Sequence, residues 1–278
     1  MKHLTILCML ITSSAFAQNT IVTMTTGYHD PVNIKVEWTG SGSITANDVA
    51  LKNDFDMKNT VIPAVDKSVV LVATGDVRLT RLYCLNNSLT ALDVKNCTEL
   101  TELRCSYNLI SALDVSNCTE LEYLNCNDNF LTTLDVTKCV KLKILNCDKN
   151  ALSALDVTNC TELLRLCCDN NFLTALDITS CPELREIFAD NQTPKLLDIS
   201  SKRNKLSIRN PVAFAGAEMM IYSISHGGMY ADDTINWKVR GKRGERTFRF
   251  TVELPEKIVG IPFSGTVTLI WTKKVLGE

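Results

Sequence analysis

The cysteines are the residues of this sequence whose type and spacing could do the most chemistry. There are 12 of them, and ten fall into two series in which each member follows the previous one by 21 residues. The first series is Cys84, Cys105, Cys126, Cys147 and Cys168, and the second is Cys97, Cys118, Cys139, Cys160 and Cys181. Cysteines in such columns could form disulfides, ligate zinc, or fill a protein core as small buried thiols.

These three uses leave different marks in a sequence. Disulfides between the two series would each close a loop of ~14 residues and stabilise an exported protein by about 3 kcal/mol. Zinc is less consistent with the spacing, because the ligands stand in columns and lack a C-x2-C pair. We favour buried free thiols, because unpaired cysteine is among the most buried residue types. For Cys167, which takes an outward strand position beside Cys168, we expect an exposed thiol.

Other catalytic groups are sparse. The three histidines are His3, His29 and His226. None lies near Cys167 in sequence, so that thiol lacks the base that a catalytic cysteine needs. Residues 79–198 hold none of the 12 glycines, which excludes a glycine-rich phosphate loop there. The acidic pairs Glu253 with Glu256 and Asp232 with Asp233 suggest no acid–base geometry. We predict no enzymatic activity, no cofactor and no metal site.

Aspartates form a third column with the same spacing. Its members are Asp93, Asp114, Asp135, Asp156, Asp177 and Asp198. A stack of calcium ions is one interpretation, but the glycine-rich turns of calcium-binding β-rolls are missing. The alternative is that each carboxylate accepts hydrogen bonds from backbone N–H groups of the turn that follows it, and we favour this alternative.

The columns arise from a 21-residue repeat. Segments beginning at Leu79, Leu100, Leu121, Leu142 and Leu163 share the pattern L-x-x-L-x-C-x-x-N-x-[LI]-x-x-L-D-[VI]-x-x-C, and a sixth, incomplete copy begins at Leu184. A unit of this length cannot bury its own apolar face, so the copies must stack.

This pattern resembles the leucine-rich repeat, L-x-x-L-x-L-x-x-N-x-L, with cysteine at the third apolar position. In architecture the chain resembles the internalins, which are bacterial surface adhesion and interaction proteins, although its repeat is one residue shorter and richer in cysteine. The resemblance covers residues 79–198. It implies a leucine-rich-repeat solenoid whose concave face binds partners.

The residues support the same fold independently. Leu103 and Cys105 should point inward and Arg104 outward, because side chains alternate along a strand. The asparagines at positions 87, 108, 129, 150 and 171 should satisfy backbone groups at the turn, in place of glycine. The L-D-V segment is too short for a helix and should form a short strand or extended turn on the convex side. We therefore expect a mostly β, right-handed parallel β coil about six turns long and about 29 Å tall.

The flanks resemble the caps that repeat stacks need. Strand-like runs at 20–25, 32–38 and 69–73 predict a small N-terminal β cap, and runs at 219–225, 235–239, 247–254 and 265–272 predict a C-terminal β domain. Residues 1–17 read as a signal peptide: Lys2, an apolar core, and Ala15-Phe16-Ala17 before Gln18. The predicted organisation is a signal peptide at 1–17, an N-terminal β cap at 18–78, a leucine-rich-repeat solenoid at 79–199 and a C-terminal β domain at 200–278.

The signal peptide predicts a secreted or cell-envelope protein, and the resemblance implies that a protein or glycan ligand binds the concave face. Outward positions vary between copies while the framework is held. We expect the ligand-binding residues to be Tyr83, Arg104, Tyr107, Tyr123, Asn125, Asp128, Asn146, Arg165 and Phe188. An ordinary solvated sheet face is the alternative for these positions. We expect no nucleic-acid partner, no transmembrane span and a monomer.

Charge divides unevenly along the chain. Residues 79–198 carry 10 basic and 17 acidic residues, whereas residues 199–278 carry 13 basic and 7 acidic residues. Several of these basic residues flank Gly241-Lys242-Arg243-Gly244, which reads as the tip of a basic hairpin. The alternative function is therefore an envelope spacer whose C-terminal β domain or basic hairpin carries the binding.

Overall fold

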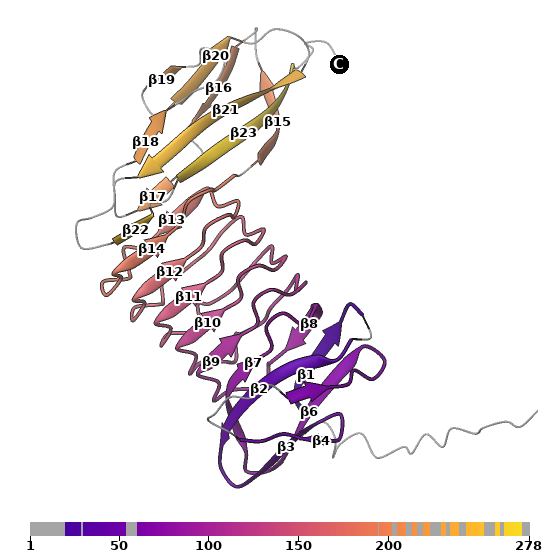
Figure 1. Cartoon of the computed structure of the whole chain (residues 1–278). Coiled ribbons are helices and arrows are strands. Elements are labelled where there is room, and N and C mark those ends of the chain that lie inside the picture. The colour runs from indigo at the N-terminus through magenta and orange to yellow at the C-terminus, as the bar shows by residue number, and fades with distance from the viewer. Residues whose placement is uncertain are drawn as a thin grey trace, which may run out of the picture.

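The computed structural model describes residues 20–28, 30–53 and 60–193 with their side chains, and beyond them the backbone of strands between residues 195 and 273. Every regular element in these residues is a β-strand. Figure 1 shows a stack of coils with strands of the N-terminal part at one end and strands of the C-terminal part at the other. The predicted signal peptide at 1–17 lies outside the described residues.

The N-terminal strands match the three predicted runs and add three short strands. They are β1 (Thr20–Thr26), β2 (Val32–Thr39), β3 (Gly42–Ala46), β4 (Val49–Ala50), β5 (Thr60–Ile62) and β6 (Ser68–Gly75). Inward and outward residues alternate along β2 and β6, as the sequence predicts.

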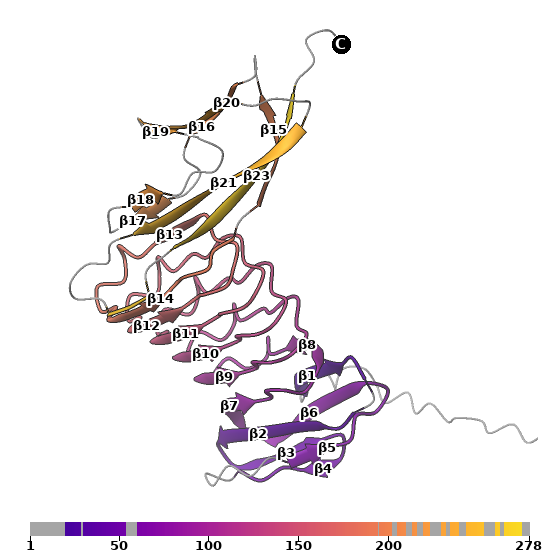
Figure 2. The ribbon, with the colours of Figure 1, turned by 45° about the horizontal axis from the view of Figure 1, so that its top comes forward.

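The repeats form a solenoid with one strand at the same position in each coil. Its strands are β7 (Arg78–Tyr83), β8 (Leu89–Asp93), β9 (Glu102–Arg104), β10 (Tyr123–Asn125), β11 (Ile144–Asn146), β12 (Arg165–Cys167), β13 (Ala175–Asp177) and β14 (Glu186–Phe188). Two of the described coils carry a second strand, β8 or β13. The strands β7, β9, β10, β11, β12 and β14 pair in parallel, each displaced from the next by one repeat. In Figure 2 they line one side of the stack, and the irregular return segments line the other. This is the predicted leucine-rich-repeat solenoid.

Seven of the nine strands described in the C-terminal part form two further sheets. The strands are β15 (Lys195–Ser201), β16 (Lys205–Arg209), β17 (Ala213–Ala215), β18 (Met219–Tyr222), β19 (Met229–Ala231), β20 (Thr234–Lys238), β21 (Arg243–Val252), β22 (Val259–Ile261) and β23 (Ser264–Lys273). One sheet has the order β15-β23-β21-β18 and the other β16-β20-β19. The predicted basic hairpin is therefore wrong: β20 and β21 belong to different sheets, and Arg243 and Gly244 extend β21 instead of turning.

The solenoid has two walls: one is the stack of β7, β9–β12 and β14, and the opposite one contains β8 and β13. Flanking strands extend both walls. On one wall, β2 pairs antiparallel with β7, and β22 pairs in parallel with β14. On the other wall, β1 pairs antiparallel with β8, and β17 pairs in parallel with β13. The open ends of the coil are thus covered by strands, which satisfies the edge groups that would otherwise invite further pairing.

The core is built from columns of leucine and cysteine. Leu103, Leu124 and Leu145 point inward from successive strands with no exposed surface, and Cys105 and Cys126 beside them are equally buried. All eleven described cysteines are buried and free of disulfides. Burial raises the pKa of the Cys84 thiol to about 12, so this side chain packs as a small neutral hydrophobe.

An amide ladder ties each coil to the next. The Asn129 side-chain oxygen accepts a hydrogen bond from Ile110 N–H at 3.0 Å, and its Nδ2 donates to the carbonyls of Cys105 and Cys126 at 3.0 and 3.1 Å. The same contacts recur at Asn108, Asn150 and Asn171. In the incomplete last copy Gln192 replaces asparagine and still reaches Leu173 N–H at 3.0 Å.

The ladder explains how the turn manages without glycine. The residue just before each ladder amide has a left-handed backbone, with φ of 56° at Tyr107, 57° at Asp128 and 51° at Lys149. Residues other than glycine rarely adopt this backbone conformation, because it costs them roughly 1–2 kcal/mol each. The buried amide bonds that follow hold it in place, as the sequence predicts for the turn.

The aspartate column confirms the capping interpretation. The Asp135 carboxylate accepts hydrogen bonds from the Thr137 backbone at 2.9 Å and from its hydroxyl at 2.6 Å. Asp93, Asp114, Asp156 and Asp177 accept the same backbone bond from the residue two positions on. Hydrogen bonds from Thr137 lower the pKa of Asp135, so the turn stabilises the ionised carboxylate. The Asp198 side chain lies outside the described residues.

We predict that Asn129→Ala lowers the free energy of unfolding by about 3 kcal/mol, because it leaves a buried N–H and buried carbonyls without partners. The measurement is urea unfolding followed by circular dichroism. Asn159→Ala is the matched control, because the exposed Asn159 side chain donates a bond at 3.1 Å to the carbonyl of Thr137. The control should lose well under 1 kcal/mol. Equal losses in both variants would contradict a structural role for the ladder.

Candidate functional site

The outward side of the stacked strands β7, β9–β12 and β14, which we call the concave face, carries two rows of side chains. One row, extended by β2, is Glu37, Arg81, Glu102, Tyr123, Ile144, Arg165 and Glu186. The other is Lys35, Tyr83, Arg104, Asn125, Asn146, Cys167 and Phe188. Within the repeats, each row consists of residues at one repeat position in successive coils. Neighbouring residues of a row are therefore separated by the distance between adjacent strands, about 4.8 Å.

Arg104 lies between two tyrosines on this face. Its guanidinium carbon is 5.1 Å from the centre of the Tyr83 ring and 4.6 Å from the centre of the Tyr123 ring. The Arg104 Nε also donates to the Glu102 carboxylate at 2.6 Å. A cation held against aromatic faces is attracted by their π-electrons, which contributes about 0.5–1 kcal/mol at an exposed site.

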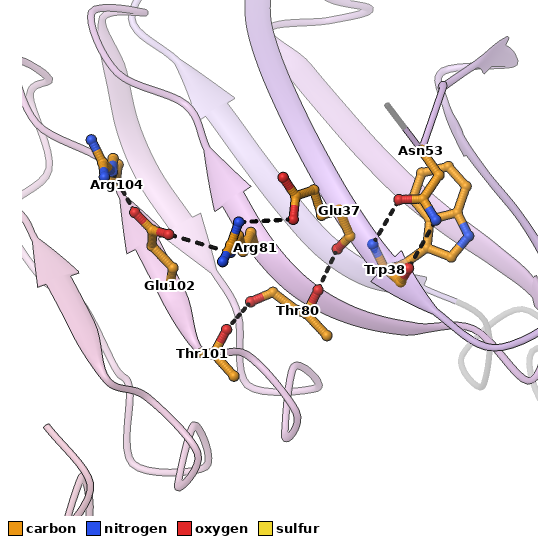
Figure 3. A network of polar contacts seen from close by, with 8 residues as sticks. All are labelled: Glu37, Trp38, Asn53, Thr80, Arg81, Thr101, Glu102 and Arg104. Carbon is orange, nitrogen blue, oxygen red and sulfur yellow. Dashed lines mark hydrogen bonds and ion pairs between the residues drawn. The ribbon is translucent and has the colours of Figure 1, made fainter. Parts of the chain in front are cut away.

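A chain of charges extends from this cluster toward the N-terminal strands (Figure 3). Arg81 contacts Glu37 at 3.1 Å on one side and Glu102 at 3.4 Å on the other, and Glu102 in turn contacts Arg104. The four charges alternate in sign and balance. Their side chains are held in one arrangement before any ligand arrives, which lowers the entropy cost of binding.

Threonine hydroxyls beside this chain of charges donate hydrogen bonds to backbone carbonyls of the preceding strand. Thr101 donates to the carbonyl of Thr80 at 3.0 Å, and Thr80 donates to the carbonyl of Glu37 at 3.2 Å (Figure 3). Asn53 fixes β2 at the same end through both backbone groups of Trp38, at 3.1 and 2.8 Å. The backbone beneath this chain of charges is therefore held in place by side-chain hydrogen bonds between neighbouring segments.

A smaller cluster of the same kind lies toward the C-terminal end of the concave face. Arg165 lies over the Phe188 ring, with its guanidinium carbon 5.2 Å from the ring centre. Its Nε is 3.3 Å from the Glu186 carboxylate. Asn125 and Asn146 stand between the two clusters, half-buried.

Two predicted site residues lie elsewhere. Tyr107 and Asp128 follow their strands by three residues and occupy the left-handed turn position, so they stand on the edge of the solenoid and not on the concave face. Strands β9–β12 and β14 are three residues long, so they end before these positions. Tyr83 is on the face but only 6% exposed, and burial together with Glu102 raises the pKa of its hydroxyl to about 12.

The prediction of an exposed thiol at Cys167 is wrong. Cys167 does take an outward register position, between Asn146 and Phe188, but it is only 5% exposed. Its side chain is the smallest in its row, so larger neighbours cover it. Burial raises its pKa, which makes the thiol a poor nucleophile.

Sequence reasoning missed the two glutamates that organise the face. Glu102 and Glu186 occupy the same repeat position as Tyr123 and Arg165, which were selected. The signal was present in the repeat, since alternating charge signs at Arg81 and Glu102 imply cross-strand pairing.

A short stack of carboxylates borders the concave face at the turn. The Asp169 backbone N–H donates to the Asp148 carboxylate at 2.7 Å, and Asp190 N–H donates to Asp169 at 2.6 Å. Burial, with the charge of Asp169 adding to it, raises the pKa of Asp148 to about 6. Burial likewise raises the pKa of Asp169.

In the part of the chain that the structure describes, no group of three His, Cys, Asp or Glu side chains is placed to hold a metal ion. No helix there is long and apolar enough to cross a membrane.

One family model matches the chain. The model described as LRR adjacent matches residues 216–269, which follow the repeats. The repeats fold as the leucine-rich-repeat solenoid that their pattern predicts, and the segment matched by the LRR-adjacent model follows them along the chain. No curated protein shows significant sequence similarity to it.

Three solved structures from Listeria monocytogenes are similar to this one. The functional domain of InlJ, described as including a cysteine ladder, is 20% identical over 70% of this chain and 67% of that chain, with a TM-score of 0.27. The internalin-like protein lmo2027 is 17% identical over 70% of this chain and 57% of that chain, with a TM-score of 0.39. The secreted internalin-like protein Lmo2445 is 18% identical over 65% of this chain and 78% of that chain, with a TM-score of 0.37.

We predict that Asp148→Asn stabilises the protein at pH 7 by about 1 kcal/mol, a value discounted for the partial exposure of the carboxyl group. A carboxyl group with a raised folded-state pKa favours folding when protonated, so its unfavourable contribution grows as pH rises from about 4 to about 6. The amide oxygen of asparagine can still accept the bond from Asp169 N–H. The measurement is the free energy of unfolding in urea between pH 4 and pH 7.5.

The matched control is Asp177→Asn on the aspartate column. Hydrogen bonds from Thr179 lower the pKa of Asp177, so removing its charge should destabilise the protein at pH 7. Loss of stability at pH 7 in Asp148→Asn as well would contradict the assignment of a raised pKa.

Proposed function

We propose that this chain is a binding protein that recognises a protein or glycan ligand through its concave face and catalyses no reaction. The observation that carries the proposal is the Arg104 cluster, in which a guanidinium is held between Tyr83 and Tyr123 and bonded to Glu102. Arginine and tyrosine are the residue types that most often dominate interface energies when they are well packed.

The arrangement of the face supports binding in a second way. Its charges are already paired, so a ligand need not separate and reorder mobile ions. Arg104 and Arg165 remain 42% and 47% exposed at their side chains, which leaves donors free to meet acceptors on a partner. Two such clusters separated by Asn125 and Asn146 give the face two anchors with hydrogen-bonding groups between them.

The face is small, since it is a short stack of strands, five of which are three residues long. We expect a modest contact area, close to the lower end of specific interfaces at about 1,200 Å². A glycan or one surface of a protein fits this size. The signal peptide predicted at 1–17 supports export, and the resemblance of the repeats to those of internalins supports a role in adhesion or interaction at a cell surface or in the envelope.

The test is binding of the purified chain to a panel of host matrix proteins and of bacterial and host glycans. The double variant Arg104→Ala with Tyr123→Ser should bind its ligand at least tenfold more weakly, because it removes the cation and one of its two aromatic partners. Lys138→Ala is the control, since it removes an exposed cation from the opposite wall. Circular dichroism and thermal unfolding check that all variants fold.

Undiminished binding of every ligand found in the panel by the double variant would contradict the proposal. It would place the site outside the concave face, and binding that also withstands changes elsewhere in the solenoid would place it in the C-terminal β domain, as expected for an envelope spacer, where residues 199–278 carry the excess of basic side chains.

A further inference from the structure

Exposed apolar side chains gather on one edge of the solenoid, away from the concave face. The position just after each ladder amide holds Leu109, Phe130, Ala151 and Phe172 in successive coils, and of these Ala151 is half-buried. Leu109, Phe130 and Phe172 are 37%, 58% and 43% exposed. Single exposed apolar residues need no explanation, but a column of them in register forms a continuous patch.

The small side chain of Ala151 leaves a gap in this column, because it lies between Phe130 of the preceding coil and Phe172 of the following coil. We call this gap the slot. A groove of about 390 Å³ lies over these residues, lined by Phe130, Ala151 and Phe172 together with Asp128, Lys149 and Asn170. The backbones of Phe130 and Phe172 are two strand spacings apart, which is about 9.6 Å.

The slot is held rigidly. Phe130 N–H donates to the carbonyl of Ile110 at 2.9 Å, and Ala151 and Phe172 N–H donate at 2.8 Å to carbonyls of the preceding coils. The buried ladder amides of the same turns fix the backbone on either side. A ligand entering the slot would meet walls that need no rearrangement.

The spacing of the coils limits the size of the ligand. The backbones at Phe130 and Phe172 are about 9.6 Å apart and carbon atoms in contact are about 3.5–4.0 Å apart, so there is room for a single ring over Ala151.

The rim selects the polarity of the ligand. Asp128 and Lys149 are 3.5 Å apart and pair with each other, so the rim has no net charge from them, and their side chains remain 43% and 58% exposed. The Asn170 side-chain amide is exposed and makes no hydrogen bond within the residues described with their side chains. The rim thus offers both donors and acceptors without favouring an ion of either sign, which is complementary to a neutral polyhydroxylated molecule.

We propose that this slot binds a pyranose ring of a neutral glycan, stacked between Phe130 and Phe172 with its hydroxyl groups bonded to Asp128, Lys149 and Asn170. The site is separate from the concave face, and it does not depend on the function proposed there.

The test is isothermal titration of the purified full chain with cellohexaose, chitohexaose and β-1,4-mannohexaose. At least one should bind, and Phe130→Ala and Phe172→Ala should each weaken that binding at least tenfold. Ala151→Phe should abolish it, because the added ring fills the slot. This variant places phenylalanine at the repeat position where Phe130 and Phe172 already stand, so the fold accommodates it; thermal unfolding checks this.

Two controls separate this site from others. Val140→Ala, at an exposed apolar residue on the other wall, and the double variant Arg104→Ala with Tyr123→Ser should both bind the hexasaccharide as the unmodified chain does. The proposal would be overturned if none of the three sugars binds, or if Ala151→Phe binds as tightly as the unmodified chain. It would also be overturned if only a tryptophan- and proline-containing peptide enters the slot, since the ligand would then be a protein.

Discussion

The buried amide ladder is the interaction on which the rest of this structure depends. Each ladder side chain bonds a backbone N–H and carbonyl of the preceding coil as well as carbonyls of its own, so it sets both the separation and the register of neighbouring coils. Asn87 extends the ladder to the cap by bonding both backbone groups of Asn33 at 2.8 and 2.7 Å. A single register from β2 to β14 follows, and with it the alignment of every outward column.

That alignment converts a sequence repeat into surfaces with separate properties. Inward positions hold leucine and cysteine in the five full coils, with Ile187 and Ala189 in the last one. Outward positions are free to differ because no core packing constrains them. On the concave face this freedom is used for alternating charges and aromatic rings, which pair across strands around Arg104. On the ladder edge it is used for Phe130, Ala151 and Phe172, whose differing sizes create a slot. The two surfaces have different chemistry on the same frame.

Much of the fold could be predicted from the sequence because the repeat reports the same physical requirement several times. The inward cysteines, the turn amides and the capping role of Asp135 all follow from residue type and period, and the structure agrees. Cys167 was mispredicted because its exposure depends on the size of its neighbours Asn146 and Phe188, which lie one repeat before it and one repeat after it in the chain. Tyr107 was mispredicted because strand length is decided by where the ladder turn begins. The prediction of a C-terminal basic hairpin was wrong because local turn residues do not reveal which sheet each strand joins.

Native-state hydrogen exchange tests the central claim most directly, because it reads the ladder coil by coil. If the amide ladder holds the stack together, the N–H groups of Leu131 and Leu152, which donate to Asn150 and Asn171 at 3.0 Å, should be among the slowest to exchange. Their exchange should require opening of the coil stack as a unit. Exchange of these two amides as fast as that of exposed turn amides, with the rest of the stack still protected, would contradict the account.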